Sequence, residues 1–349
     1  MAASLAARRA TSVVAAARRA ASRGAASAAA APQAAKGFAD LLAQKRGGGK
    51  KKGAGMSGTA GKGVVRAPLT KGVVSPKRHV PEEIVRPPYA ASGINPPFTD
   101  DLAVHDAAGV AKMRASCGLA ARVLDMVAGI IEPGITTDYI DQKVHDMIVG
   151  AGAYPSPLNY GFFPKSVCTS LNECICHGIP DDTVLEDGDI INVDVTAYLD
   201  GYHGDTSRTF LVGNVSQQHV DLVSVTRESL ELAIAVCGPG VPVNKIGHTI
   251  HAHADKHKLG VVREFVGHGV GQKFHCGPTV VHCRNRERGK MVENQTFTIE
   301  PMLTIGTTRG QMWRDEWTVT TADKKWTAQF EHTILITADG AEILTASQL

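Results

Sequence analysis

The fold is decided by one stretch of sequence, Ile190-Ile-Asn-Val-Asp-Val-Thr-Ala-Tyr-Leu-Asp-Gly-Tyr-His-Gly-Asp205. Apolar and polar residues alternate on both sides of its Asp200-Gly201 pair, which is the strongest short signal for a β-hairpin. With that pair as the two-residue turn, Thr196 faces Asp205, and Asp194 lies on the same face as their diagonal neighbour. Residues so placed have Cα atoms about 7 to 8 Å apart. The stretch therefore predicts two carboxylates on one face of a hairpin.

Two further acidic residues lie in strand-like runs later in the chain. Glu300 lies in Gln295-Thr-Phe-Thr-Ile-Glu-Pro301, and Glu331 lies in Gln329-Phe-Glu-His-Thr-Ile-Leu-Ile336. An acidic residue in an apolar strand is costly unless its charge is compensated. A single acidic residue in such a strand is as often an ordinary solvated side chain as a site residue. The prediction of a site therefore rests on the whole set.

That set consists of metal-ligand types: Asp194, Asp205, His268, Glu300 and Glu331. Carboxylates a few ångströms apart stay ionised together only when cations lie among them. Two divalent cations balance four negative charges, and paired ions can bind a bridging hydroxide and polarise a carbonyl group. The set therefore points to a two-metal hydrolase.

The periodicity of the chain predicts two similar halves. Residues 110–131 and 220–236 carry apolar residues at helical spacing, and Pro-Gly or Gly-Pro-Gly ends each stretch. The pattern Pro133-Gly-Ile-x4-Ile140-x3-Val144-His145 then recurs as Pro239-Gly-Val-x4-Ile246-x3-Ile250-His251. Such a repeat predicts two α+β halves that pack helices on one side of a curved antiparallel sheet.

Six segments resemble those of type I methionine aminopeptidases, which belong to the peptidase M24 family. They are Cys176-His-Gly-Ile-Pro180, Asn192-Val-Asp-Val-Thr196, Gly201-Tyr-His-Gly-Asp-Thr-Ser207, Gly267-His-Gly-Val-Gly271 with His275, Thr298-Ile-Glu-Pro301 and Gln329-Phe-Glu-His332. The resemblance implies the α+β pita-bread fold, also called the creatinase/aminopeptidase fold, with pseudo-two-fold halves and the metals between them.

The resemblance also implies a role for each residue. Asp194 would chelate one cation, Asp205 and Glu331 would bridge both, and His268 and Glu300 would complete the other. The cations would be Co, Mn, Fe or Zn, a choice that an oxygen-rich site with one imidazole leaves open. Glu300 would relay the proton of the attacking water. His275 would bond the substrate carbonyl or oxyanion, and His177 the amide being cleaved.

An apolar slot for the methionine side chain is implied by the same motifs. Its lining residues would be Tyr160, Phe163, Cys168, Phe274 and Trp317, since aromatic faces and a thiol make favourable contacts with a thioether. An aromatic residue in a strand is more often plain core, so this assignment rests on the resemblance. Phe162 and Pro157 depart from the residues usual in the family, so the rim of the slot is expected to differ from that of relatives.

The expected function is co-translational removal of the initiator methionine from nascent proteins whose second residue is small. Glu300 and Glu331 are 31 positions apart, which leaves no room for the helical insertion of type II members. Two alternatives are a metallopeptidase of the Xaa-Pro aminopeptidase or prolidase kind and a non-catalytic binding protein with the same fold. The presence of all five ligand types and both histidines favours the enzyme.

Charge and composition divide the chain. Residues 1–99 contain 17 Lys plus Arg and 3 Asp plus Glu, whereas residues 100–349 contain 20 and 31. The acidic body is poorly suited to nucleic acid, and no run approaches the ~18 apolar residues of a membrane span. We expect a monomer that acts on nascent polypeptide N-termini near an organellar ribosome.

Three segments are expected. Residues 1–65 resemble a transit peptide and disordered basic linker, because the first 39 residues lack acidic side chains and the first 35 include 18 alanines. The alternative is a disordered basic tail that binds a polyanion. Residues 66–98 read as a proline-rich extended arm, and residues 99–349 as the catalytic domain. The presequence fits chloroplast or mitochondrion, and we favour the plastid.

Overall fold

A computed structural model describes residues 66–347. The predicted transit peptide and linker, residues 1–65, lie outside the described residues. The first half of the described chain contains, in order, α3 (Ala107–Ala128), α4 (Thr137–Gly150), β1 (Tyr154–Pro155), the 3-10 helix η1 (Tyr160–Phe162), β2 (Cys168–Leu171), β3 (Cys174–Cys176), β4 (Ile190–Leu199) and β5 (Tyr202–Leu211).

The second half contains two helices followed mainly by short strands. In order they are α5 (Gln217–Ala235), α6 (Asn244–Lys256), β6 (Gly260–Val261), β7 (Gly267–Gly269), β8 (Cys276–Val280), β9 (Thr296–Ile299), β10 (Met302–Thr304), β11 (Gly310–Met312), β12 (Val319–Thr321), β13 (Thr327–Gln329), β14 (Glu331–Ile336) and β15 (Ala341–Ile343). Within residues 66–347 no helix is long and apolar enough to span a bilayer.

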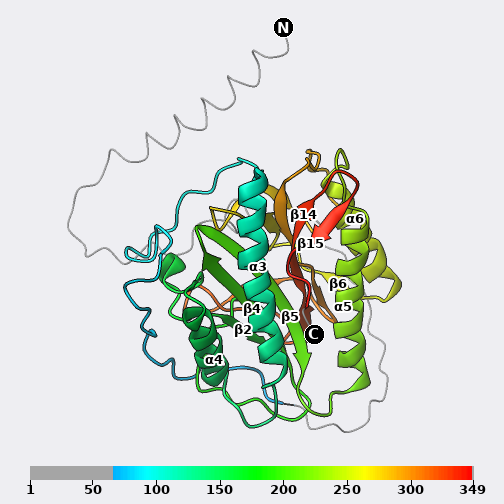
Figure 1. Ribbon diagram of the computed structural model, residues 1–349. Helices are drawn as coiled ribbons and strands as arrows, with labels where there is room; N and C mark the ends of the chain where they lie inside the picture. Colours follow the sequence, from blue (N-terminus) through cyan, green and yellow to red (C-terminus); the bar gives the residue numbers. More distant parts are fainter. Residues whose placement is uncertain (1–65, 348–349) are drawn as a thin grey trace, which may run out of the picture. The chain divides into compact units, whose positions relative to one another are not determined.

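The largest sheet has nine strands and runs in the order β1-β4-β5-β14-β9-β7-β8, with β2 paired to β4 and β15 to β14. Its named strand pairs are antiparallel. Two three-stranded sheets, β13-β10-β6 and β11-β12-β3, are also present. Figure 1 shows α3 lying across β4 and β5, with α5 and α6 beyond β14. The α+β class predicted from the sequence is confirmed by this arrangement.

The hairpin of β4 and β5 has the predicted register. Leu199 pairs with Tyr202 across the turn, and Thr196 pairs with Asp205. The two turn residues have positive φ, 50° at Asp200 and 87° at Gly201. Two successive positive φ values define the type I′ turn, whose twist matches that of the strands it joins. The Asp-Gly pair therefore fixes which face of the hairpin carries the two carboxylates.

The helices form separate cores in the two halves. In the first core, Val123 on α3 packs in one cluster with Val195 on β4. In the second, Ile250 on α6 clusters with Ile334 on β14. Burying each such aliphatic side chain contributes about 1.5 to 3 kcal/mol relative to exposing it. The helices α3–α4 and α5–α6 thus repeat one arrangement, as the recurring sequence pattern predicts.

Helix α3 begins and ends about three residues before the predicted bounds. Asp106 caps its N-terminus, because Asp106 Oδ1 accepts a 2.7 Å hydrogen bond from the backbone N–H of Gly109. At the other end the chain leaves the helix at Gly129. The apolar pattern alone could not locate these ends, since capping depends on single polar residues outside the pattern.

At two places the chain passes between the large sheet and the small sheet β13-β10-β6, once from β9 to β10 and once from β13 to β14. An acidic residue lies at each of these crossings. Glu300 follows β9 of the large sheet and, with Pro301, precedes β10 of the small one. Glu331 begins β14 of the large sheet, directly after Phe330 separates it from β13 of the small one. Because β9 pairs with β14 and β10 with β13, the two crossings lie next to each other.

Residues 66–98 run without regular secondary structure along the first half and are held by long-range polar contacts. Arg78 pairs with Asp138 at 3.0 Å and with Asp141 at 2.7 Å. Tyr89 is buried, and its hydroxyl donates a 2.7 Å hydrogen bond to the carbonyl of Ser156.

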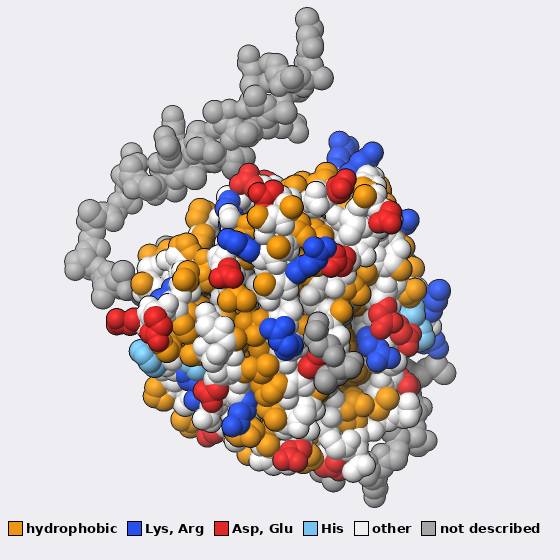
Figure 2. Space-filling view, in the orientation of Figure 1, with side chains coloured by type: hydrophobic (Ala, Val, Ile, Leu, Met, Phe, Trp, Pro, Cys, Tyr) orange, Lys and Arg blue, Asp and Glu red, His pale blue; other side chains and the backbone are white. Residues whose placement is uncertain are grey.

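On the face drawn in Figure 2, acidic and basic side chains are interspersed among apolar ones.

Candidate metal centre

The hairpin of β4 and β5 presents Asp194 and Asp205 to one pocket. Thr196 Oγ1 donates a 2.7 Å hydrogen bond to Asp205 Oδ1, which fixes that carboxylate. Asp194 pairs in register with Ser207, two positions along the hairpin from the Thr196–Asp205 pair, so its side chain points to the same face. Asp205 is buried, and Asp194 is partly buried.

Glu300 and Glu331 reach the same pocket from the crossings between the sheets. Thr298 Oγ1 donates a 2.9 Å hydrogen bond to Glu300 Oε1, and Gln329 Nε2 donates at 3.5 Å to Glu300 Oε2. The backbone N–H of Glu300 donates to His282 Nε2 at 3.0 Å. Glu300 is therefore held at its main chain and at both carboxylate oxygens, and its orientation is well determined before anything binds.

His268 lies on β7 between the carboxylates. Its Nε2 is 3.7 Å from Asp205 Oδ2 and 3.6 Å from Glu300 Oε1. Its Nδ1 is 3.2 Å from the carbonyl oxygen of Gly269, so a proton on Nδ1 is donated there and the lone pair of Nε2 faces the acids. Ligand atoms of Asp205, His268 and Glu331 all lie within 4.8 Å of one another. Asp194 and Glu300 are outside that tightest group but line the same pocket.

Burial governs the protonation of these acids. Desolvation raises the pKa of Asp205 to about 7. Desolvation, followed by the nearby charge of Asp205, raises the pKa of Asp194, Glu300 and Glu331 well above the ordinary range. Burial lowers the pKa of His268 to about 4, so its imidazole is neutral and able to donate a lone pair. Four acids that are ionised only with difficulty, beside a neutral imidazole, fit divalent cations.

The stability of the metal-free protein is expected to fall as pH rises above about 6.5 and through about 7, the raised pKa of Asp205. A carboxyl group whose pKa is raised by folding contributes stability that is fully present below its unfolded pKa and is lost as pH rises through its folded pKa. For Asp205 this interval runs from 3.8 to about 7, and the other three acids also have raised pKa values. The buried histidines act in the opposite sense, but only below pH 6.5, the ordinary pKa of histidine.

The melting temperature in chelator across this pH interval measures the effect. Saturating Mn²⁺ or Co²⁺ should remove most of the fall, because a bound cation compensates the carboxylates as protons do at lower pH. Asp205→Asn should reduce the fall in chelator. A metal-free melting temperature that stays constant or rises over the interval would contradict the assignment of the acids as a cation site.

The pocket above the acids is a cavity of about 230 Å³ with mostly apolar walls. All twelve residues that the sequence singled out line it: Asp194, Asp205, His268, Glu300, Glu331, His177, His275, Tyr160, Phe163, Cys168, Phe274 and Trp317. Phe163 and Trp317 meet edge to face with ring centroids 5.2 Å apart, and Tyr160 lies 5.0 Å from Phe274. The aromatic residues thus form a wall of the pocket rather than of a closed core.

Two histidines other than His268 face this cavity. The Nδ1 of His275 is 2.9 Å from the hydroxyl of Tyr160, and burial raises the pKa of Tyr160, so the phenol keeps its proton and can donate it. When the phenol donates to Nδ1, the ring proton of His275 is on Nε2, which is then a donor. His177 follows β3 with a φ of 56°, and its ring stands edge-on to those of Phe265 and Trp317.

Several lining residues were not found from the sequence. From the arm come Asn95, Pro96 and Phe98, and from loops and strands come Glu264, Phe265, Val266, Met312 and Glu316. For Phe265 a signal existed, since it precedes the motif that carries His268 by only a few residues. The arm residues carry no local signal, because long-range contacts decide where they lie.

The two departures from the family pattern differ in their placement. Pro157 lines the pocket. Phe162 is not among the lining residues and is 42% exposed. Its ring occupies the space beside Gly93, where an added Cβ would lie 2.6 Å from the ring. Phe162 also has a φ of 66°, a conformation that glycine adopts more readily than other residues.

Comparison with known proteins gives a consistent result. Residues 111–338 match metallopeptidase family M24. The chain is 63% identical to methionine aminopeptidase 1D, chloroplastic/mitochondrial, of Arabidopsis thaliana over 80% of each chain, and 59% identical to methionine aminopeptidase 1B, chloroplastic, of the same plant over 80% of this chain and 75% of that one.

The comparison with solved structures confirms the fold. The crystal structure of methionine aminopeptidase from Rickettsia prowazekii matches with a TM-score of 0.69 at 43% identity, covering 70% of this chain and 100% of that one. The predicted pita-bread fold, with its two similar halves and curved antiparallel sheet, is therefore the fold of this chain.

Proposed function

The chain belongs to metallopeptidase family M24, and on this premise we propose that its pocket performs the reaction of a type I methionine aminopeptidase. The protein hydrolyses the peptide bond after an N-terminal methionine and so removes the initiator methionine from proteins. One observation carries this conclusion most directly. Ligand atoms of two acids and a histidine lie within 4.8 Å of one another at a pocket walled by aromatic rings and a thiol.

Two divalent cations would be held by the five ligand-type residues. Asp205, His268 and Glu331, whose ligand atoms lie within 4.8 Å of one another, would hold them together with Asp194 and Glu300 from the same pocket. When bound, such cations lower the pKa of water and polarise the scissile carbonyl. The pair is supported by charge, because two dications balance the four carboxylates that line the pocket.

Glu300 is the group that accepts the proton of the attacking water and returns it to the departing amine. Thr298 and Gln329 hold its two oxygens, so its orientation does not have to be selected during the reaction. Its pKa is raised by burial and by the neighbouring acids. A raised pKa makes a carboxylate a better proton acceptor near neutral pH.

The histidines position the substrate. His275 is oriented by its hydrogen bond with Tyr160, and its Nε2 proton is donated to the carbonyl oxygen, on which negative charge develops. His177 hydrogen-bonds the amide being cleaved. The methionine side chain lies among Tyr160, Phe163, Cys168, Phe274 and Trp317, where the thioether contacts aromatic faces and the thiol.

A choice of peptides tests the reaction. With Mn²⁺ or Co²⁺ supplied, a Met-Ala-Ser peptide should lose its methionine, whereas an Xaa-Pro peptide should not be cleaved. The free amino acids are measured by chromatography. Cleavage of the Xaa-Pro peptide alone would identify the protein as the prolidase kind of M24 enzyme. Cleavage of neither peptide at any metal concentration would support a binding role.

The residue after the methionine should decide the rate. We expect Met-Ala peptides to be cleaved much faster than Met-Leu peptides, as the likeness to type I methionine aminopeptidases implies. The ratio of kcat/KM for the two peptides at equal metal concentration measures this preference. Equal values would show that the pocket does not exclude a bulky second residue.

The protein is proposed to act in an organelle on N-termini that emerge from the ribosome. Relatives at 63% and 59% identity carry the names chloroplastic/mitochondrial and chloroplastic, which supports an organelle and slightly favours the plastid. Under this proposal residues 1–65 serve as transit peptide and linker, residues 66–98 as an arm, and residues 99–349 as the catalytic domain acting as a monomer. Fusing residues 1–65 to a fluorescent protein and observing whether chloroplasts or mitochondria import it tests the proposed targeting.

A further inference from the structure

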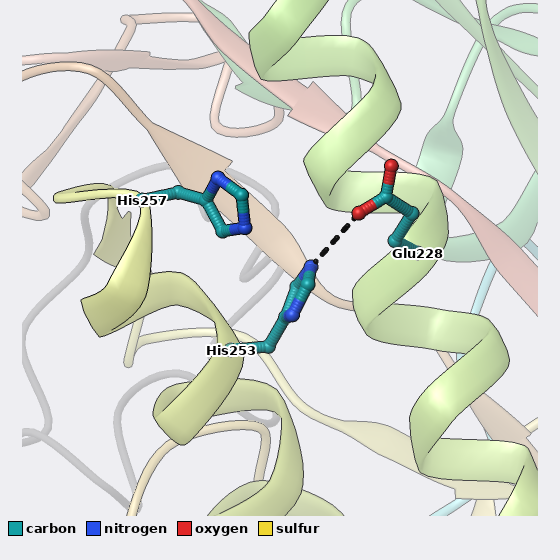
Figure 3. Close-up of side chains that lie close together, drawn as sticks. All are labelled: Glu228, His253 and His257. Atoms are coloured by element: carbon teal, nitrogen blue, oxygen red, sulfur yellow. Dashed lines mark hydrogen bonds and ion pairs between the residues drawn. The ribbon is translucent and has the colours of Figure 1, made fainter.

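A second group of metal-ligand side chains lies on the helical side of the second half. Glu228 on α5 faces His253 on α6 and His257, the residue directly after α6. Ligand atoms of the three lie within 4.8 Å of one another. Figure 3 shows His253 on α6 and His257 just beyond its end, with both rings on the side of Glu228. None of the three lines the pocket that contains Asp205 and His268.

The spacing of the histidines suits a shared ion. His253 and His257 are four residues apart, so both side chains lie on one face at the C-terminal end of α6. Their ring centroids are 4.8 Å apart. Two imidazoles at this spacing on a helix, with a carboxylate from a neighbouring element, form a recurring ligand set for zinc.

The contact between His253 and Glu228 has the geometry of two ligands on one ion. His253 Nε2 lies 3.2 Å from Glu228 Oε2. Two ligands bound at about 2.0 to 2.1 Å to a tetrahedral ion are themselves about 3.3 Å apart. The pair can thus accept an ion with almost no movement. His257 is exposed and follows the helix, so its ring can turn to complete the set.

A neighbouring side chain orients the carboxylate. Ser224, one turn earlier on α5, donates a 3.0 Å hydrogen bond from Oγ to Glu228 Oε1. The other carboxylate oxygen, Glu228 Oε2, is then directed toward His253. Outer partners of this kind fix a ligand and strengthen metal binding. Glu228 and His257 also line a hollow at the surface beside α5, so the ligands can be reached from solvent.

We propose that Glu228, His253 and His257 bind one borderline dication of the Zn²⁺, Ni²⁺ or Cu²⁺ class and thereby link α5 to the end of α6. Two imidazoles and one carboxylate favour these ions over Mg²⁺ and Ca²⁺, which prefer oxygen ligands. Three protein ligands leave a fourth position for water. The site is separate from the metals of the proposed peptidase reaction and does not depend on that reaction.

Zinc titration of the full chain tests the proposal. Isothermal titration with ZnCl₂ should find one more bound equivalent in the wild-type protein than in His257→Asn or His253→Asn. His251→Asn is the matched control, because His251 lies on the same helix and is near Asp255 instead, at 3.7 Å. That variant should bind as many equivalents as the wild type.

Two other readouts separate this site from the catalytic one. With Mn²⁺ supplied, His253→Asn and His257→Asn should cleave Met-Ala-Ser peptide at the wild-type rate, which also shows that they fold. Zinc should raise the melting temperature of the wild type by several degrees more than that of His257→Asn, since an ion that binds only the folded state stabilises it. Unchanged zinc stoichiometry in both variants, or loss of the same equivalent in His251→Asn, would overturn the proposal.

Discussion

Alanine in place of His268 or Glu300 is expected to lower kcat for a Met-Ala-Ser peptide by about 10³-fold or more while the protein stays folded. His268 is the imidazole donor of the acidic cluster, with Nε2 3.6 Å from Glu300 Oε1, and Glu300 is the proposed proton acceptor. Removing either leaves the remaining acids without a complete ligand set. Single-turnover and steady-state rates at saturating Mn²⁺ measure the loss, and circular dichroism checks the fold.

Two further variants make this result specific. Glu300→Gln keeps the size of the side chain and a partner for Thr298, but cannot accept a proton, so it should be about as inactive as Glu300→Ala. His219→Ala removes a histidine that stacks on Trp326 with centroids 3.7 Å apart, away from the pocket, and should keep wild-type kcat. Wild-type kcat in His268→Ala or Glu300→Ala would remove those residues from the mechanism.

Gly204→Ala should destabilise the protein by about 3 kcal/mol and also weaken cation binding. Gly204 lies on β5 directly before Asp205, and α3 passes over it at backbone distance. An added Cβ would lie 2.4 Å from the backbone nitrogen of Cys117 and 2.4 Å from the backbone carbon of Ser116. The backbone of α3 cannot shift without a large cost in free energy, so β5 has to move away from it. Asp205, the next residue on β5, moves as well.

Urea unfolding with and without Mn²⁺ measures both effects. Gly118→Ala is the matched control, because Gly118 lies on the same helix and the nearest heavy atom to its added Cβ is Arg122 Nη1 at 3.5 Å. Alanine there should stabilise the helix by roughly 0.5 to 1 kcal/mol. If Gly204→Ala were as stable as the wild type, the close contact between α3 and β5 would not be required by the fold.

The parts of the fold that the sequence predicted are those specified locally. The Asp200-Gly201 turn and the alternation around it determined the pairing of Thr196 with Asp205, because a strand has a period of two and a two-residue loop leaves one register. The repeated helical pattern likewise predicted the two halves. Helix ends were displaced by about three residues at α3, since they depend on the cap Asp106 rather than on periodicity.

The same distinction applies to the site. The residues brought together around the pocket are carried by short motifs, so they could be named before any distance was known. Asn95 and Pro96 could not, because the course of the arm follows from pairs such as Arg78 with Asp141, which are 63 positions apart. Glu228 and His253 are separated by 25 positions, and one histidine pair among 14 histidines gives no signal until α5 and α6 are packed.

The ion pair of Arg66 sets a limit on proteolytic trimming from the N-terminus. The guanidinium of Arg66 pairs with Asp189, whose side chain is almost wholly inaccessible, and the nearby backbone N–H of Leu69 donates to Glu173. A cut beyond Arg66 would leave a buried carboxylate without its cation, a loss that is strongly destabilising. A processing protease that cuts before Arg66 spares this pair. The position of the mature N-terminus is thus constrained by the folded body as well as by the protease that removes the presequence.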